Sequence, residues 1–132
     1  MSKARVIVVD DSVDTAEALA CVLTLDGYSV RIAHDGAAAA ALVETFAPHG
    51  VLFDINMPIM DGNELSKQLR ERFGDDIVLI AITGEDSSET RVAAAFGRVD
   101  HYFRKPIDPK DLRRVFPPQT GDRDLPPLVS DY

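Results

Sequence analysis

The stretch Val6-Ile7-Val8-Val9-Asp10-Asp11 is an apolar run that ends on two carboxylates. Further apolar runs along the chain end on Asp54, on Thr83 and on Arg104 followed by Lys105. Uninterrupted apolar runs are typical of strands that are buried on both faces of a parallel sheet. Because the carboxyl ends of parallel strands meet at one edge of the sheet, we expect these polar residues to lie together there.

Helix and strand signals alternate along the chain. Helices are predicted over Asp14 to Asp26, Ala37 to Phe46, Gly62 to Phe73, Ser87 to about Phe96, and Pro109 to Phe116. An edge strand is predicted over Tyr28 to Ala33, because apolar and polar residues alternate there. Right-handed crossovers place such helices against both faces of a parallel sheet. We therefore predict an α/β fold of the flavodoxin-like, doubly wound class. It has three layers (α/β/α), five parallel strands in the order 2-1-3-4-5, and a short last helix.

Length and composition limit the number of domains and the classes of function that are possible. The 132 residues suit one domain, which we place at residues 1–116, followed by a proline-rich acidic tail at 117–132 that is either disordered or packed on the domain. The net charge of -8 argues against nucleic-acid binding. The longest apolar run, Ile77 to Ile82, is too short to span a membrane, so we expect a cytoplasmic protein. We expect Cys21 to pack as a small apolar residue, and the three histidines to be surface or turn residues.

The residues at the strand ends suit phosphoryl chemistry. Asp10, Asp11 and Asp54 would repel one another unless they bind a cation or retain a proton. Hard divalent cations such as Mg²⁺ (or Mn²⁺) prefer carboxylate oxygens and often complete their shell with phosphate oxygens. Lys105 can neutralise a phosphoryl oxygen and the Thr83 hydroxyl can donate to another. Asp54, alone on its strand, is the best candidate nucleophile.

Each of these residues also has a purely structural interpretation. Asp10, Asp11 and Ser12 could cap a helix, and Thr83 could be a turn residue before Gly84. Five such residues at the ends of four strands are better explained by a shared function. We therefore favour a site that accepts a phosphoryl group.

These motifs resemble those of response-regulator receiver domains of two-component signalling, of the chemotaxis-regulator type. The matching stretches are Val8-Val9-Asp10-Asp11-Ser12, Asp54 to Gly62, Ile82-Thr83-Gly84 and Tyr102-Phe103-Arg104-Lys105-Pro106, and the likeness covers about residues 4–116. It implies that Asp54 accepts a phosphoryl group from a phosphohistidine on a sensor histidine kinase or a histidine phosphotransfer protein. It also implies that Asp10, Asp11, Asp54 and the backbone carbonyl of Asn56 bind Mg²⁺.

The resemblance further implies a switch. Thr83 would move toward the phosphoryl group and Tyr102 would turn inward. This changes the surface of the fourth helix and fifth strand, to which a downstream protein partner would bind. A structural alternative for Tyr102 is a half-buried aromatic on an edge strand. Asn56 and Glu85 would set the lifetime of the phosphorylated state, although Glu85 could equally be only solvated. A cis Lys105–Pro106 bond is also implied.

Rival functions fit less well. A haloacid-dehalogenase-type phosphatase needs a second Asp two positions after the nucleophile, where this chain has Asn56. A nucleotide-binding domain needs glycines after the first strand. We therefore expect no turnover enzyme but a protein that catalyses its own phosphorylation and dephosphorylation. It would act as a single-domain relay, or as one domain of a longer hybrid protein, and as a monomer or weak phosphorylation-dependent dimer. The turn between Gly97 and Tyr102 is about one residue longer than is usual in the family.

Overall fold

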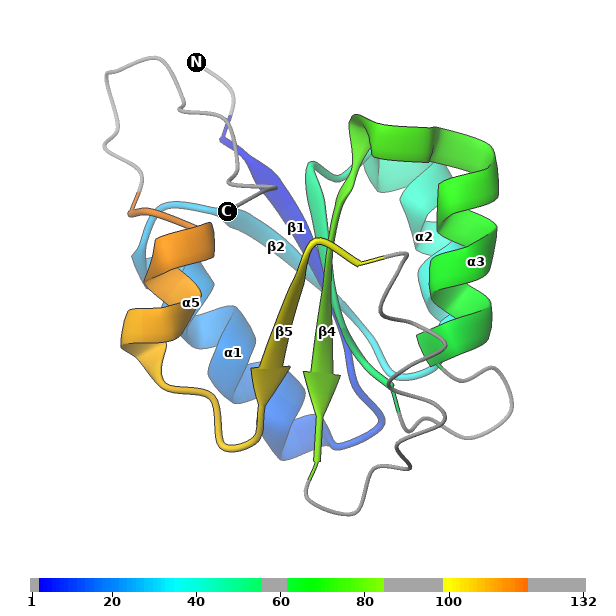
Figure 1. Cartoon of the computed structure of the whole chain (residues 1–132). Coiled ribbons are helices and arrows are strands. Elements are labelled where there is room, and N and C mark those ends of the chain that lie inside the picture. Colours follow the sequence, from blue (N-terminus) through cyan, green and yellow to red (C-terminus); the bar gives the residue numbers. More distant parts are fainter. Residues whose placement is uncertain (1–2, 56–61, 85–98, 119–132) are drawn as a thin grey trace.

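A computed structural model describes residues 3–55, 62–84 and 99–118 of the chain (Figure 1). The strands are β1 (Arg5–Val9), β2 (Ser29–Ala33), β3 (Gly50–Asp54), β4 (Val78–Thr83) and β5 (His101–Arg104). All neighbouring strands pair in parallel, and the order is β2-β1-β3-β4-β5. The predicted fold class and strand order are confirmed.

Helices cover both faces of this sheet. They are α1 (Val13–Leu25), α2 (Gly36–Phe46), α3 (Gly62–Phe73) and α5 (Pro109–Val115), with a short 3-10 helix η1 (Gly74–Asp76) after α3. Helices α1 and α5 lie on one face, and α2 and α3 lie on the other (Figure 1). The helix predicted over Ser87 to Phe96 lies outside the described residues.

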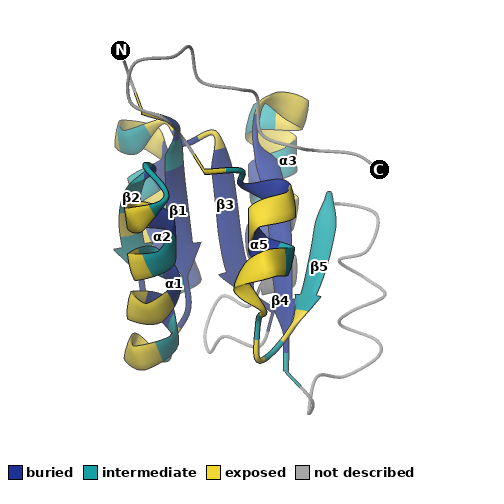
Figure 2. Ribbon diagram, turned by 90° about the vertical axis from the view of Figure 1, so that its left-hand side faces the viewer, coloured by how far each residue is buried: buried dark blue, intermediate teal, exposed yellow. Residues whose placement is uncertain are grey.

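The strands divide the core into two layers, because successive side chains of a strand point to opposite faces. In β1, Val6 and Val8 pack toward α1 and α5, whereas Ile7 and Val9 pack toward α2 and α3. Every residue of β3 and β4 is buried, while β2 and β5 at the edges are only partly buried (Figure 2). The continuous apolar runs thus mark the central strands, as predicted.

Polar side chains start the helices immediately after the strand ends. The Ser12 hydroxyl accepts a hydrogen bond from Thr15 N and begins α1, and Asp35 accepts from Ala38 N and begins α2. Each cap satisfies a backbone N–H that would otherwise lack a partner. The chain therefore leaves β1 and β2 by short turns, and this keeps Asp10 and Asp11 at the edge of the sheet.

The sequence-based expectation for Cys21 is wrong. The buried side of α1 consists of Ala16, Leu19 and Leu23, which recur at helical spacing. Cys21 falls between these positions and is exposed. The described part of the chain contains no helix that could span a membrane.

One ion pair and several hydrogen bonds hold Asp100, the residue before β5. Arg70 on α3 donates to the carbonyls of Gly74 and Ile77 and to Asp100 Oδ2 at 2.7 Å. Asp100 Oδ2 also accepts from Leu79 N at 2.9 Å. Asp100 thus joins the start of β5 to α3 and β4, at the sheet edge opposite the carboxyl ends of the strands.

The short last helix is also confirmed, and it is fixed at its end. Phe116 packs edge-on against Tyr28, with ring centroids 5.6 Å apart. The Tyr28 hydroxyl donates to Pro117 O at 2.7 Å, and Arg113 pairs with Asp26. Residues 119–132 lie outside the described residues, so the division into a domain at 1–116 and a tail at 117–132 stays a prediction.

Candidate functional site

Four buried or half-buried polar residues lie at the carboxyl ends of adjacent strands. Asp10 directly follows β1, Asp54 ends β3, Thr83 ends β4 and Lys105 follows β5. Asp10, Asp54 and Thr83 are buried and Lys105 is partly exposed. The strand order places these ends side by side, as the sequence predicts.

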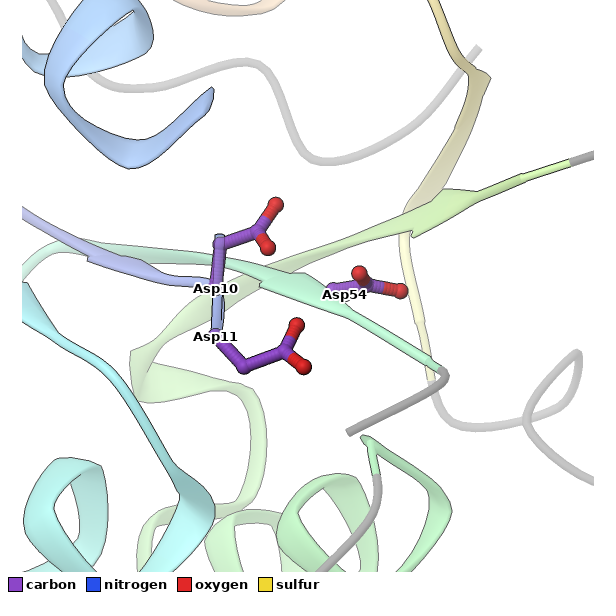
Figure 3. Close-up of side chains that lie close together, drawn as sticks. All are labelled: Asp10, Asp11 and Asp54. Atoms are coloured by element: carbon purple, nitrogen blue, oxygen red, sulfur yellow. The ribbon is translucent and has the colours of Figure 1, made fainter. Parts of the chain in front are cut away.

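Asp11 completes an acidic cluster with Asp10 and Asp54 (Figure 3). One carboxylate oxygen from each residue lies within 4.8 Å of the others, and only Asp11 is exposed. Three carboxylates so close together repel one another strongly where water is excluded. The three carboxylates therefore require a compensating positive charge nearby.

Lys105 supplies part of that charge. Its Nζ lies 3.0 Å from Asp54 Oδ2, to which it donates a hydrogen bond, and 3.0 Å from Asp10 Oδ2. The backbone N–H of Lys105 donates to Thr83 O at 2.8 Å, and the Lys105–Pro106 bond is cis, as the resemblance implies. The ammonium thus sits between two carboxylates at a position fixed by the end of β4.

The carboxyl pKa of Asp10 is raised, chiefly because burial penalises the charged form and also because Asp54 repels it. A hydrogen bond from Ser12 N and the nearby Lys105 act in the opposite direction. Burial alone would lower the pKa of Lys105, but the contacts with Asp54 and Asp10 outweigh it and raise the pKa. Lys105 is therefore a cation at neutral pH.

The donor set fits a hard divalent cation. With all groups ionised, three negative charges and one positive charge leave a net charge of -2 in the cluster. Asp10 Oδ2 is buried, and within the described residues it accepts no hydrogen bond although it lies close to the Lys105 ammonium. Such an oxygen has a free lone pair for a metal, and carboxylate oxygens are the ligands that Mg²⁺ prefers.

Two predicted residues, Asn56 and Glu85, lie outside the described residues. Tyr102 lies on β5, opposite Ala81 of β4, and is partly buried against the core layer that faces α2 and α3. It is thus on the strand next to Thr83, where the predicted switch requires it. Its position is equally that of an edge-strand aromatic.

His34 lies near the site and is not among the predicted site residues. The ring of His34, which immediately follows β2, has Nδ1 3.1 Å from the backbone oxygen of Asp10. The sequence does carry a signal, since His34 is a polar residue directly after a strand, as Asp10 is.

An open cleft of about 690 Å³ lies next to the cluster. It is lined by Asp14, Thr15, Ala18 and Leu19 of α1 and by Gly84, Lys105, Pro106 and Ile107. Lys105 is therefore shared by the acidic cluster and the cleft. A group that enters the cleft can reach the Lys105 side chain.

Comparison with known protein families matches residues 6–116 to the response regulator receiver domain. Among curated relatives, the response regulator MprA of Mycobacterium avium is 38% identical over 108 residues, which are 82% of this chain and 47% of the relative. MprA of Mycobacterium tuberculosis is also 38% identical over the same length. The chain spans about half the length of these relatives.

Solved structures show the same likeness. A CheY-like receiver domain from Methanospirillum hungatei superimposes with a TM-score of 0.80 and 29% identity, covering 86% of this chain and 90% of that one. A signal receiver domain from Bermanella marisrubri has a TM-score of 0.76 and 30% identity, and covers 89% and 98% of the two chains.

Proposed function

This chain belongs to the response-regulator receiver family, the phosphoacceptors of two-component signalling, and on that premise we propose that Asp54 is the residue that accepts the phosphoryl group. Sensor histidine kinases are the partners of response regulators. The donor we propose is therefore a phosphohistidine on such a kinase or on a histidine phosphotransfer protein. One observation carries the proposal: buried Asp54, at the end of a central strand, lies close to two further carboxylates and to a lysine ammonium.

The reaction is a phosphoryl transfer between two side chains. An Asp54 carboxylate oxygen attacks the phosphorus and the phosphorus–nitrogen bond of the donor breaks. Its electron pair stays on the ring nitrogen, and the donor, already protonated on its other ring nitrogen, leaves as neutral imidazole. The product is an acyl phosphate. Such a transfer depends mainly on positioning and on charge stabilisation.

The residues around Asp54 supply the positioning and the charge stabilisation. Lys105, 3.0 Å from Asp54 Oδ2, would neutralise one phosphoryl oxygen, and the Thr83 hydroxyl would donate to another. Asp10, Asp11 and Asp54, with the Asn56 carbonyl, would hold Mg²⁺ (or Mn²⁺). When bound by these residues, the cation would supply positive charge that offsets the charge of the carboxylates and of the incoming phosphoryl group.

The output of the phosphorylated state is proposed to be a surface change. Thr83 would move toward the phosphoryl group, and Tyr102 would turn into the space that Thr83 leaves. Asn56 and Glu85 are proposed to set the lifetime of the acyl phosphate. The single-domain relay, the cytoplasmic location and the absence of nucleic-acid binding all stay predictions, as does a monomer or weak dimer.

Intact-mass spectrometry tests the metal requirement. The protein is incubated with a small acyl phosphate donor, once with Mg²⁺ and once with excess EDTA. We expect one phosphoryl adduct with Mg²⁺, and at least about tenfold less adduct with EDTA, because three carboxylates would then repel the incoming phosphoryl group.

Two variants are matched controls for this experiment. Asp54→Asn removes the proposed nucleophile, whereas Asp75→Asn makes the same chemical change at an exposed residue of η1. We expect no adduct on the first and the parental amount on the second. An adduct that is equal with EDTA would contradict the metal requirement, and an equal and stable adduct on Asp54→Asn would contradict the assignment of the nucleophile.

A further inference from the structure

His34 makes an unusual contact at the end of the β1–β2 pairing. The last paired positions are Val9 and Ala33, and one residue further Asp10 N donates to Ala33 O at 3.1 Å. In a regular parallel ladder, a backbone N–H of the neighbouring strand would then donate to the Asp10 carbonyl. Here the ring of His34 occupies that place, with Nδ1 3.1 Å from Asp10 O.

The direction of this hydrogen bond follows from its acceptor. A carbonyl oxygen only accepts, so Nδ1 of His34 carries the proton and donates it. The oxygen belongs to the peptide group that joins Asp10 to Asp11. Because a peptide group is planar, holding its oxygen also limits the direction in which the Asp11 backbone and side chain continue.

The position of Asp11 depends on the hydrogen bond from His34 more than the position of Asp10 does. Asp10 is held by its N–H, by Ser12 N at its Oδ1 and by Lys105 near its Oδ2. Asp11 is exposed, and in the described part of the chain no hydrogen bond or ion pair to its carboxylate is found. Its place in the acidic cluster is therefore set by the backbone.

We propose that His34 is a positioning residue for the divalent cation: its ring holds the Asp10–Asp11 peptide so that both carboxylates face the same ion. This inference rests on the proposed function, because it assumes that the acidic cluster binds Mg²⁺. His34 itself touches neither the ion nor the phosphoryl group. Loss of the hydrogen bond to Asp10 O should weaken Mg²⁺ binding about threefold to tenfold, the effect of one net hydrogen bond.

Isothermal titration calorimetry with MgCl₂ on the unphosphorylated protein measures this directly. We expect weaker binding in His34→Ala and recovery to within about twofold of the parent in His34→Asn, whose amide nitrogen can donate from nearly the same place as Nδ1. His34→Gln places its amide one bond further out and should not recover. The free energy of unfolding without metal should change little in all three, since His34 is exposed.

His49→Ala is the control for a general loss of structure. His49 Nδ1 accepts a hydrogen bond from Arg5 N at 2.9 Å, at the start of β1 and away from the cluster. We expect this variant to be less stable but to bind Mg²⁺ as the parent does.

The outcomes separate the two proposals. If the parent binds no Mg²⁺, the proposed metal site fails. If the parent binds and His34→Ala binds equally well, or if His34→Ala and His49→Ala weaken binding alike, the role of His34 is overturned. The same holds if His34→Asn binds no better than His34→Gln, a comparison that remains valid even if the alanine variant does not fold.

Discussion

At the scale of single residues, burial and metal binding have opposite effects on the charge of Asp10. It is fully buried, which disfavours its charge, but it must be charged to bind a cation. Its raised pKa means that the folded protein holds the Asp10 proton more tightly than the unfolded chain does. The stability that this provides is present below the ordinary pKa of 3.8 and is lost as the pH rises through the folded-state pKa.

Asp10→Asn should therefore separate stability from function. The amide keeps the acceptor for Ser12 N but carries no charge. At pH 7 without metal, we expect the free energy of unfolding to rise by about 1 kcal/mol, as in other substitutions that relieve a functional site. Urea unfolding measures this change.

The pH dependence of the free energy of unfolding tests whether the added stability of Asp10→Asn has an electrostatic cause. The difference between Asp10→Asn and the parent should shrink as the pH falls through the folded-state pKa of Asp10, because the parent is then protonated too. Calorimetry with MgCl₂ should meanwhile show that the variant has lost its Mg²⁺ affinity. A variant that is less stable than the parent at pH 7 would contradict the electrostatic explanation.

Strands β4 and β5 contain the proposed switch at the scale of elements. Their register pairs Ala81 with Tyr102 and Thr83 with Arg104, so the two switch residues lie on neighbouring strands. A movement of Thr83 toward a phosphoryl group would open space beside β5. Because packed interiors leave few voids, a neighbouring side chain should fill that space.

Fluorotyrosine labelling with ¹⁹F NMR tests the switch. On addition of Mg²⁺ and beryllofluoride, a stable mimic of the phosphoryl group, we expect the Tyr102 signal to shift and the signal of buried Tyr28 to stay. Thr83→Ala should abolish the shift, whereas Thr83→Ser, which keeps the hydroxyl, should retain it. A Tyr102 signal that moves equally in Thr83→Ala would show that Thr83 does not drive the change.

The contact between α5 and the start of β2 gives a second prediction at this scale. Tyr28→Phe removes the donor to Pro117 O but keeps the ring against Phe116. We expect the free energy of unfolding to fall by about 1 kcal/mol, the usual net value of one hydrogen bond. Tyr28→Ala, which also removes the ring, should cost about 4 kcal/mol.

Urea unfolding of both variants measures the contribution of the Tyr28 hydroxyl and that of the Tyr28 ring separately. If Tyr28→Phe were as stable as the parent, the hydroxyl would contribute nothing to fixing the end of α5. The order of the two variants should be the same with and without Mg²⁺, because Tyr28 takes no part in the acidic cluster.

For the whole molecule, the strand order and the edge that carries the site could be predicted from the sequence. Apolar runs before Asp10, Asp54 and Thr83 identify doubly covered strands, and the crossover rule then leaves few arrangements. The site follows because those strands end next to one another. The apolar pattern is thus sufficient to locate the cluster without any distance being known.

Other features could not be predicted, because they depend on side-chain contacts between distant parts of the chain. Arg70 and Asp100 are 30 positions apart, and nothing in the spacing of charges indicates that they pair. The contact of His34 with Asp10 O likewise depends on where a turn places one ring. The apolar neighbours of Cys21 predict a packed side chain, but Cys21 does not lie on the buried stripe of α1 and is exposed.

Chemical trapping of the phosphorylated residue tests the central claim most directly. The protein is incubated with Mg²⁺ and a small acyl phosphate donor and then treated with borohydride, which reduces an aspartyl phosphate to homoserine. Fragmentation of the resulting peptides identifies the reduced position. We predict homoserine at position 54 and at no other aspartate, and none without the donor. Homoserine at Asp10 or Asp11, or a phosphoryl adduct that leaves no homoserine at position 54, would contradict the claim.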